Sequence, residues 1–307
     1  MKVFVFEFAT GGGYAGQALP EFLPDGETMW RALVDDLIAV DGVEVLTLRD
    51  ERLPQPDQDG VHIVVTGADR FEDDFRHCLM SADAVWIVAP EEEDLLETLN
   101  RDVLQAGKRL LGCRPEAVRI AASKYATAQQ LGSAGIAIAP TYSSPYLMVE
   151  DGPVVAKPDK GAGCQDTLYF ANLTAAEEWL LPHGGTGFVF QHFLWGDHLS
   201  LSLLCHENSS QLLSVNRQHI GLENDRLRFL GVTPDALPDT DGRYADLARK
   251  VVSAIPGLWG YVGIDLIDTD FGPVILEVNP RVTVSYAGLR AALDFNPAEK
   301  VLSLPHL

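Results

Sequence analysis

The sequence has few cysteines, and none lies close to another. Its 307 residues contain only Cys78, Cys113, Cys164 and Cys205, without a Cys-x-x-Cys motif. This distribution excludes a cysteine-based zinc site and a disulfide framework. We therefore predict reduced, mostly buried thiols.

Basic residues are also scarce. The chain has 23 Lys and Arg against 44 Asp and Glu, which gives a formal net charge of −21. Such a charge opposes binding to nucleic-acid backbones and to anionic membrane surfaces, and it favours solubility. We accordingly predict no nucleic-acid partner, and each basic residue in a prominent position needs its own explanation.

Long apolar runs are absent too, since no segment approaches the length needed to span a bilayer. The first eight residues read as a strand and lack the apolar region and cleavage site of a signal peptide. We expect a cytoplasmic protein with no membrane contact. The oligomeric state stays open, and a homo-oligomer is one alternative.

The chain does contain enough apolar residues, 47% of the total, to bury a large core in two or three domain-sized units. Residues 1–113 alternate between continuous apolar runs and segments with helical periodicity, which indicates an N-terminal α/β domain with a covered parallel sheet. We predict strands at 3–8, 43–48, 62–65, 84–88 and 109–111, and helices at 28–38, 71–81 and 94–106.

Beyond this domain, two α+β subdomains are predicted, at 114–186 and 187–307. A Pro-His-Gly-Gly-Thr-Gly stretch at 182–187 marks the division between them. The predicted helices are 115–122, 124–131, 175–181 and 244–253. The predicted strands are 146–149, 154–157, 167–170, 188–191, 198–205 and 211–216, followed by a hairpin.

The hairpin carries the most informative residues of the chain. If it closes between Thr269 and Pro273, Asp265 lies opposite Glu277, and Asn279 shares the face of Glu277. Acidic residues in a hairpin are ordinarily solvated, but the second strand is too apolar for free exposure, and an unpaired buried carboxylate would be costly. Three oxygen ligands that converge in this way suit Mg²⁺, which usually also binds nucleotide phosphates.

A second group of residues suits phosphate binding. The apolar strand 154–157 ends at Lys157, a compact charge for phosphate, and the Lys160-Gly-Ala-Gly163 turn that follows lets backbone N–H groups approach an anion. Lys124 begins a helix, where a cation is unfavourable unless an anion lies beside it. A solvated turn and an exposed helix lysine are the plain alternatives.

Three further segments are weaker candidates. Residues 191–194 form either a core strand or a linker that offers backbone hydrogen bonds to adenine. Gly11–Gly16 matches Gly-x-Gly-x-x-Gly, but Pro20, Pro24 and Gly26 interrupt the helix that should follow, so we expect a mobile loop that contacts a ligand. We interpret Glu91–Asp94 as a solvated acidic cluster at a helix start.

The order of these motifs resembles the ATP-grasp superfamily over nearly the whole chain. The resemblance implies that ATP lies between the two α+β subdomains, with Lys124 and Lys157 on its phosphates and the glycine loop over them. Mg²⁺, or Mn²⁺ in its place, would be held by Asp265, Glu277 and Asn279. The implied nucleotide contacts are Lys124, Lys157, Lys160, Gly161, Gly163, Gln191, His192, Phe193, Leu194 and His198. The sequence departs from the family at Gln191, where glutamate is usual, and at His198, where the acid that contacts ribose is expected.

Within the superfamily, the segments at 6–13, 214–218 and 277–286 look most like the tyramine–glutamate ligases of methanofuran biosynthesis. This resemblance implies an ATP-dependent ligase that joins glutamate to tyramine or tyrosine through an acyl phosphate. Lys157, Arg217 and Arg281 would then act on the transferring phosphoryl group or on a substrate carboxylate. Another ATP-grasp amino-acid or peptide ligase, and a nucleotide-binding regulatory protein without catalysis, remain as alternatives.

Overall fold

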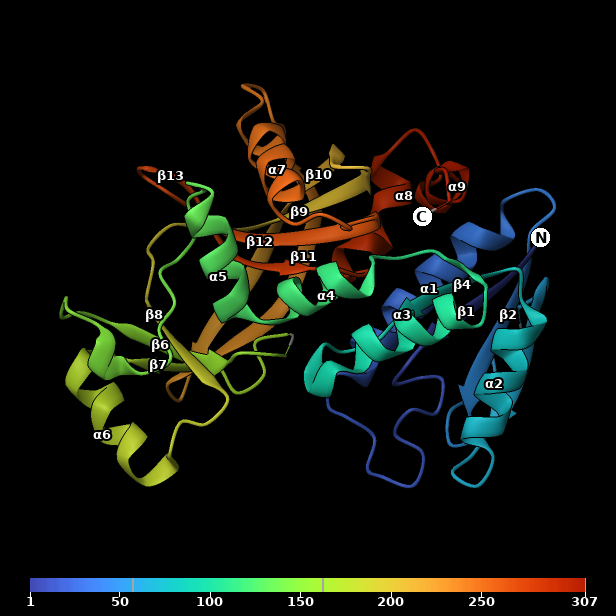
Figure 1. The fold of residues 1–307 in the computed structure, drawn as a ribbon, viewed down its shortest axis with the longest axis horizontal. Helices are drawn as coiled ribbons and strands as arrows, with labels where there is room; N and C mark the ends of the chain where they lie inside the picture. The colour runs from blue at the N-terminus through green and yellow to red at the C-terminus, as the bar shows by residue number, and fades with distance from the viewer. Residues whose placement is uncertain (57, 162, 307) are drawn as a thin grey trace.

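The computed structural model describes residues 1–56, 58–161 and 163–306. The N-terminal part forms a parallel sheet covered by helices (Figure 1). The strand order is β3-β2-β1-β4-β5, so β1 lies in the middle. The strands are β1 (Lys2–Glu7), β2 (Glu44–Asp50), β3 (Val61–Thr66), β4 (Ala84–Val88) and β5 (Arg109–Leu110), and the helices are α1 (Leu23–Ile38), α2 (Phe71–Ser81) and α3 (Leu95–Gln105).

The two faces of this sheet bury different residues of the same strands. Val3 and Val5 belong to one core cluster with Trp30 of α1. Phe4 and Phe6, which alternate with these valines, belong to another cluster, and the Phe6 ring centroid lies 4.9 Å from that of Phe75 of α2. Because side chains alternate along a strand, a strand covered on both faces must be apolar throughout, as β1 is.

The rest of the chain forms an antiparallel sheet with the strand order β13-β12-β9-β10-β11-β7-β6-β8. Within the described residues, the β6–β8 segment pairs with the larger part through Arg226↔Leu168, between β11 and β7. The strands are β6 (Val154–Pro158), β7 (Leu168–Phe170), β8 (Phe188–His192), β9 (Asp197–His206), β10 (Ser209–Glu223), β11 (Arg226–Leu237), β12 (Gly260–Thr269) and β13 (Gly272–Asn279). The helices are α4 (Pro115–Ala122), α5 (Lys124–Ser133), α6 (Leu173–His183), α7 (Arg243–Ala254), α8 (Leu289–Ala292) and α9 (Pro297–Ser303), with 3₁₀ turns η1 (Glu92–Asp94), η2 (Pro145–Leu147) and η3 (Val284–Gly288).

Core packing distinguishes the β6–β8 segment from the remainder. Val154, Ala176 and Phe190 form a small cluster with Met148 and Ala156. The N-terminal sheet and the large antiparallel sheet share a larger hydrophobic core cluster. Figure 1 shows β6, β7, β8 and α6 gathered on one side of the molecule, away from α1 and α2. The predicted fold class, an α/β part followed by α+β parts, is confirmed, and the predicted boundaries at 113/114 and 186/187 stay predictions.

Several predicted elements were wrong in type or extent. The predicted strand at 146–149 is instead the turn η2, because Pro145 opens it and the Ser144 hydroxyl accepts a hydrogen bond from the Tyr146 N–H. Helix α1 begins five residues earlier than predicted, at Leu23 against 28, because Pro24 in a first turn loses no intrahelical hydrogen bond.

Strand β11 was missed altogether. It carries Gly231 and Pro234, which read as turn residues, but both lie beside irregularities in the pairing with β10. Proline and glycine are tolerated at such bulges.

Within the described chain, no helix is long and apolar enough to cross a membrane.

Candidate active site

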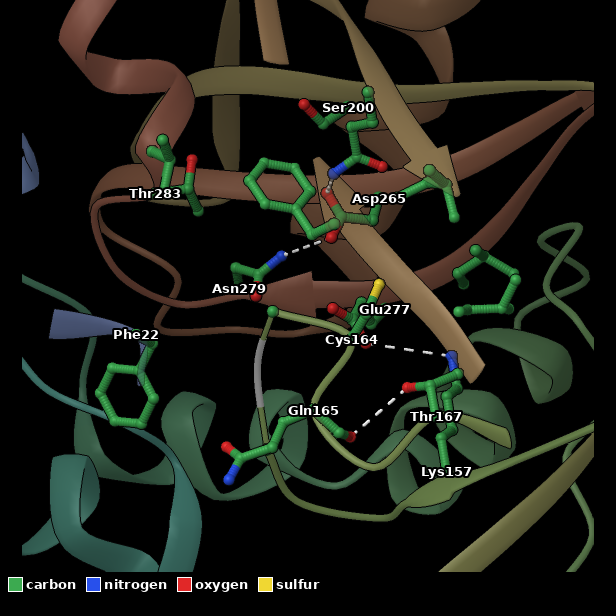
Figure 2. A pocket seen from close by; sticks show the side chains of 18 of the residues that line it. Phe22, Lys157, Cys164, Gln165, Thr167, Ser200, Asp265, Glu277, Asn279 and Thr283 are labelled. Atoms are coloured by element: carbon green, nitrogen blue, oxygen red, sulfur yellow. Dashed lines mark hydrogen bonds and ion pairs between the residues drawn. The ribbon is translucent and has the colours of Figure 1, made fainter. Parts of the chain in front are cut away.

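A cavity of about 690 Å³ collects side chains from the N-terminal part, the glycine loop, strand β8 and the β12–β13 hairpin. Figure 2 shows Asp265, Glu277 and Asn279 on one side of it, with Lys157 across from them. Residues more than 250 positions apart in sequence, such as Glu7 and Glu277, line the same space.

The hairpin brings its three oxygen-bearing side chains together as predicted. The pairing register sets Asp265 opposite Glu277 and Gly263 opposite Asn279. The Asn279 amide donates to Asp265 Oδ2 at 3.2 Å, and the Gln218 amide of β10 donates to Oδ1 at 3.0 Å. The hairpin and the Asp265–Glu277 pair are therefore confirmed, but near the turn the register differs by one residue, and an irregularity between Asp265 and Leu266 makes up the difference. Gln218 is a contact that the sequence did not reveal.

The two carboxylates have opposite electrostatic environments. Burial, followed by the charge of Glu277, raises the pKa of Asp265. Burial also acts to raise the pKa of Glu277, but Lys124 and Lys157 outweigh it and hold that pKa below its usual value. Two like charges buried side by side repel one another, so the arrangement favours a cation between them.

A divalent cation fits this donor set. Two carboxylates and an amide oxygen, with room for water and phosphate, are the ligands that Mg²⁺ and Mn²⁺ take in nucleotide sites. The described residues contain no group of three or more His, Cys, Asp or Glu side chains placed to hold a metal. The site thus depends on the amide of Asn279 for its third oxygen.

Two buried lysines face the same carboxylate. Lys124 Nζ lies 3.4 Å from Glu277 Oε2, and Lys157 Nζ lies 4.0 Å from it. Lys124 is only 6% exposed and Lys157 only 8%, so neither is a solvated surface lysine. Burial lowers the pKa of Lys157, while Glu277 opposes this effect. An anion with more charge than one carboxylate would satisfy both ammonium groups better.

The glycine loop contributes backbone rather than charge to the cavity. Gly161 and Gly163 line it with φ of 146° and 67°, a backbone region that favours glycine. Residue 162 lies outside the described chain. Lys160 does not line the cavity, because its ammonium pairs with Asp94. The structure thus brings the two glycines, but not Lys160, into the site.

Strand β8 and the segment after it form another wall. Gln191, His192, Phe193 and Leu194 all line the cavity, as does His198 at the start of β9. The buried Gln191 amide donates to the Thr141 hydroxyl at 2.8 Å, so this side chain is fixed within the protein. An adenine contact in this wall would rest on backbone groups and apolar surface, as the sequence predicted, and it stays a prediction.

The two arginines singled out in the sequence have different positions. Arg281 lines the cavity, whereas Arg217 does not and instead pairs with Asp197 at 2.9 Å. Its neighbour Gln218 reaches the site in its place, since adjacent side chains of a strand point to opposite faces. The structure therefore does not bring Arg217 together with the other candidates.

Glu91 corrects an expectation. We interpreted it as part of a solvated cluster, but it is 4% exposed and its carboxylate contacts Arg281. Glu7, at the carboxyl end of β1, is another buried acid that lines the cavity, and it accepts hydrogen bonds from the Ala9 and Thr10 N–H groups at 3.2 and 2.7 Å. The segment at 6–13 signalled this position only through family resemblance.

Hydroxyl groups also form part of the cavity lining. Ser200, Thr283 and Ser285 are all in the lining. The Tyr261 hydroxyl lies 3.0 Å from the Thr283 hydroxyl and 2.9 Å from that of Ser202. This network can hold a polar substrate group, and no sequence motif predicted it.

Comparison with known proteins agrees with this geometry. The ATP-grasp domain family matches residues 121–285, and the pre ATP-grasp 3 domain matches residues 43–118. The first match spans more than half of the chain. The protein therefore belongs to the ATP-grasp family, which confirms the family resemblance predicted from the sequence.

Two curated relatives are more specific. The chain is 29% identical to the tyramine–L-glutamate ligase of Methanocaldococcus jannaschii over 94% of this chain and 84% of that protein. It is 28% identical to the enzyme of the same name from Methanocaldococcus fervens, over 94% of this chain and 89% of that protein.

Solved structures share the fold. An ATP-grasp superfamily protein from Archaeoglobus fulgidus superposes with a TM-score of 0.75 at 22% identity, covering 100% of this chain and 89% of that one. The L-amino acid ligase from Bacillus licheniformis gives a TM-score of 0.68 at 16% identity, covering 100% of this chain and 74% of that one.

Proposed function

We propose that the protein is an ATP-dependent carboxylate–amine ligase, and that it joins the side-chain carboxylate of glutamate to tyramine or tyrosine. ATP would transfer its γ-phosphoryl group to the carboxylate, which releases ADP and gives an acyl phosphate. The amine then attacks the acyl carbon, phosphate leaves, and the nitrogen loses a proton. The carboxylate oxygen, a poor leaving group, is thereby replaced by a good one.

One observation carries this proposal: two buried lysines, Arg281 and a pair of carboxylates face a single cavity. Lys124 and Lys157 are placed to neutralise phosphate oxygens, and the guanidinium of Arg281 suits an acyl phosphate or a carboxylate. Mg²⁺ held by Asp265, Glu277 and Asn279 would supply further charge neutralisation at the phosphates.

The narrower choice of substrates rests on the curated relatives named tyramine–L-glutamate ligase. The cavity is compatible with it, because Phe22, Met29 and Val284 give one end apolar surface beside the acids Glu7 and Asp25. An aromatic amine combines an apolar ring with a cation, and that wall offers both kinds of contact. On this basis we propose a role in the biosynthesis of a methanofuran-type cofactor.

A phosphate-release assay tests the proposal. Purified protein with Mg·ATP should release phosphate when glutamate and an amine are both present, and mass spectrometry should find the glutamyl amide. Tyramine and tyrosine should head a panel of amino acids and amines. Release with a different pair would identify another ATP-grasp ligase, and no release with any pair would refute ligase activity.

Trapping of the intermediate provides a second measurement. Hydroxylamine captures acyl phosphates as hydroxamates, so glutamate, Mg·ATP and hydroxylamine should yield glutamyl hydroxamate without a natural amine. Tight nucleotide binding with neither hydroxamate nor phosphate would favour a regulatory nucleotide-binding protein. The Glu277→Gln variant serves as the control, because its amide keeps the shape of the side chain and removes its charge.

A further inference from the structure

A buried ion pair joins the N-terminal part of the chain to the end of the β12–β13 hairpin. Arg281 Nε lies 2.9 Å from Glu91 Oε1, and Arg281 Nη2 donates a hydrogen bond to Glu91 Oε2 at 3.1 Å. The Nε and Oε1 atoms form an ion pair, but they do not form a hydrogen bond. The two residues are 190 positions apart in the sequence.

Both partners are withdrawn from water, with side-chain exposures of 5% for Glu91 and 8% for Arg281. Taking two charges out of water costs about as much as their attraction returns, so a buried pair is a poor device for stability alone. A buried pair does fix geometry, because each side chain has one favourable arrangement.

Protein groups hold the Arg281 guanidinium in place, and some of its N–H groups are left to donate hydrogen bonds to a ligand. It carries five N–H groups. Nη1 donates to the Val282 carbonyl at 3.1 Å, and Nη2 donates to Glu91. Among the described residues, each terminal nitrogen therefore keeps one N–H without a partner, and Arg281 lines the cavity that also contains Lys124 and Lys157.

The charges around Arg281 explain why an anchor is needed. Asp265 and Glu277 also attract its guanidinium. Without a competing carboxylate, the arginine would be drawn toward the two acids of the hairpin and would occupy the place of a cation. Glu91 pulls from the N-terminal side and can hold the guanidinium away from them.

We propose that Glu91 is a positioning residue, which orients the guanidinium of Arg281 toward the transferring phosphoryl group and keeps it off the carboxylates of the hairpin. The proposal rests on the ligase function proposed above. It also makes the catalytic arrangement depend on the N-terminal part, since Glu91 follows β4 of the parallel sheet.

The test compares Glu91→Gln with Glu93→Gln. Glu93 is an exposed acid two residues away, so its variant removes the same charge from the same segment without touching Arg281. We expect Glu91→Gln to lower kcat about 10²-fold, because a misplacement of about 1 Å can cost that much. The KM for ATP should change little, and Glu93→Gln should behave as wild type. A folded Glu91→Gln enzyme with wild-type kcat would overturn the proposal.

Two further variants separate positioning from a purely structural role. In an Arg281→Lys background, Glu91→Gln should have little additional effect on kcat, because the guanidinium that it orients is gone. Equal losses in both backgrounds would contradict the proposal. Should Glu91→Gln fail to fold, Glu91→Asp keeps the charge but is one methylene shorter. Full kcat in Glu91→Asp would show that charge alone is needed, which would also overturn positioning.

Failure of the ligase function would be recognised separately, as wild-type protein that releases no phosphate with any substrate pair. In that case the proposal is tested by binding. Wild-type protein should retain Mg·ADP with fluoroaluminate, a mimic of the transferring phosphoryl group, and Glu91→Gln should retain it about tenfold less well if a charge-assisted contact is misplaced. Equal retention by Glu91→Gln and Glu93→Gln would refute the positioning role.

Discussion

Replacement of Lys157 by methionine should separate nucleotide binding from folding. The side chain is buried, and its ammonium lies 4.0 Å from Glu277 Oε2. Burial lowers the pKa of Lys157, so the folded protein holds this charge less readily than the unfolded chain does. Methionine fills a similar volume without the charge. We therefore expect the protein without nucleotide to be as stable as wild type, or more stable.

The magnitude of the binding defect follows from the contact that is lost. Two unit charges at 4.0 Å interact by roughly 4 kcal/mol at an effective dielectric of about 20, which the cost of burial largely offsets. A charge-assisted hydrogen bond to phosphate contributes about 1.5–3 kcal/mol net. At about 1.4 kcal/mol per factor of ten, Lys157→Met should weaken Mg·ATP binding roughly 10-fold to 150-fold.

Lys160→Met is the matched control, because this lysine lies three residues further along the chain but pairs with Asp94 outside the cavity. Isothermal titration should detect the affinity loss in Lys157→Met only, and thermal melting should show that its stabilisation by Mg·ATP is reduced. Equal losses in both variants would show that the loop acts through general charge. Unchanged affinity in Lys157→Met would refute the phosphate contact.

Three further predictions concern the metal, the core and pH. Glu277→Gln should lower turnover by about 10²-fold to 10³-fold in the phosphate-release assay, as loss of one preorganised contact commonly does, and retained turnover would remove the metal assignment. Tyr286→Phe removes a hydrogen bond of 2.8 Å to the buried Asp36 carboxylate and should lower the free energy of unfolding by about 1.5–3 kcal/mol in urea titrations; a change near zero would show that Asp36 is satisfied without it. Burial raises the pKa of Glu7 above its usual value of 4.5, so the folded state binds this proton more tightly and stability falls as pH rises from 4.5 through the raised pKa. Glu7→Gln should therefore show a shallower fall over that window in pH-dependent denaturation, and an unchanged slope would contradict the assignment.

The geometry of the predicted metal site was largely accessible from the sequence because it depends on local rules of strand pairing. A hairpin has a two-residue side-chain period, so closing it between Thr269 and Pro273 predicts Asp265 opposite Glu277. In the structure Thr269 pairs with Gly272, and a one-residue irregularity between Asp265 and Leu266 restores the predicted pair. Lys157 was recognised for a similar reason, as a charged residue at the end of an apolar strand.

Other residues could not be placed by local rules. Arg217 and Gln218 are adjacent, and which of them faces the cavity depends on which face of β10 the rest of the protein covers. The irregularity between Val215 and Arg217 in the pairing with β11 further obscures the alternation. Lys160 looked equivalent to Lys157 until its partner Asp94, 66 positions away, was known.

The sequence by itself determined the fold class and the family, and it predicted the metal and phosphate groups, because periodicity, turn residues and motif order are properties of short segments. Tertiary structure alone decided which charges are buried and which side chains meet. The sequence predicted a solvated Glu91, because the burial of this carboxylate depends on its contact with Arg281 and not on its neighbours in sequence. The energies of buried charges are set by such distant partners, so the environment of the site had to be read from the folded chain.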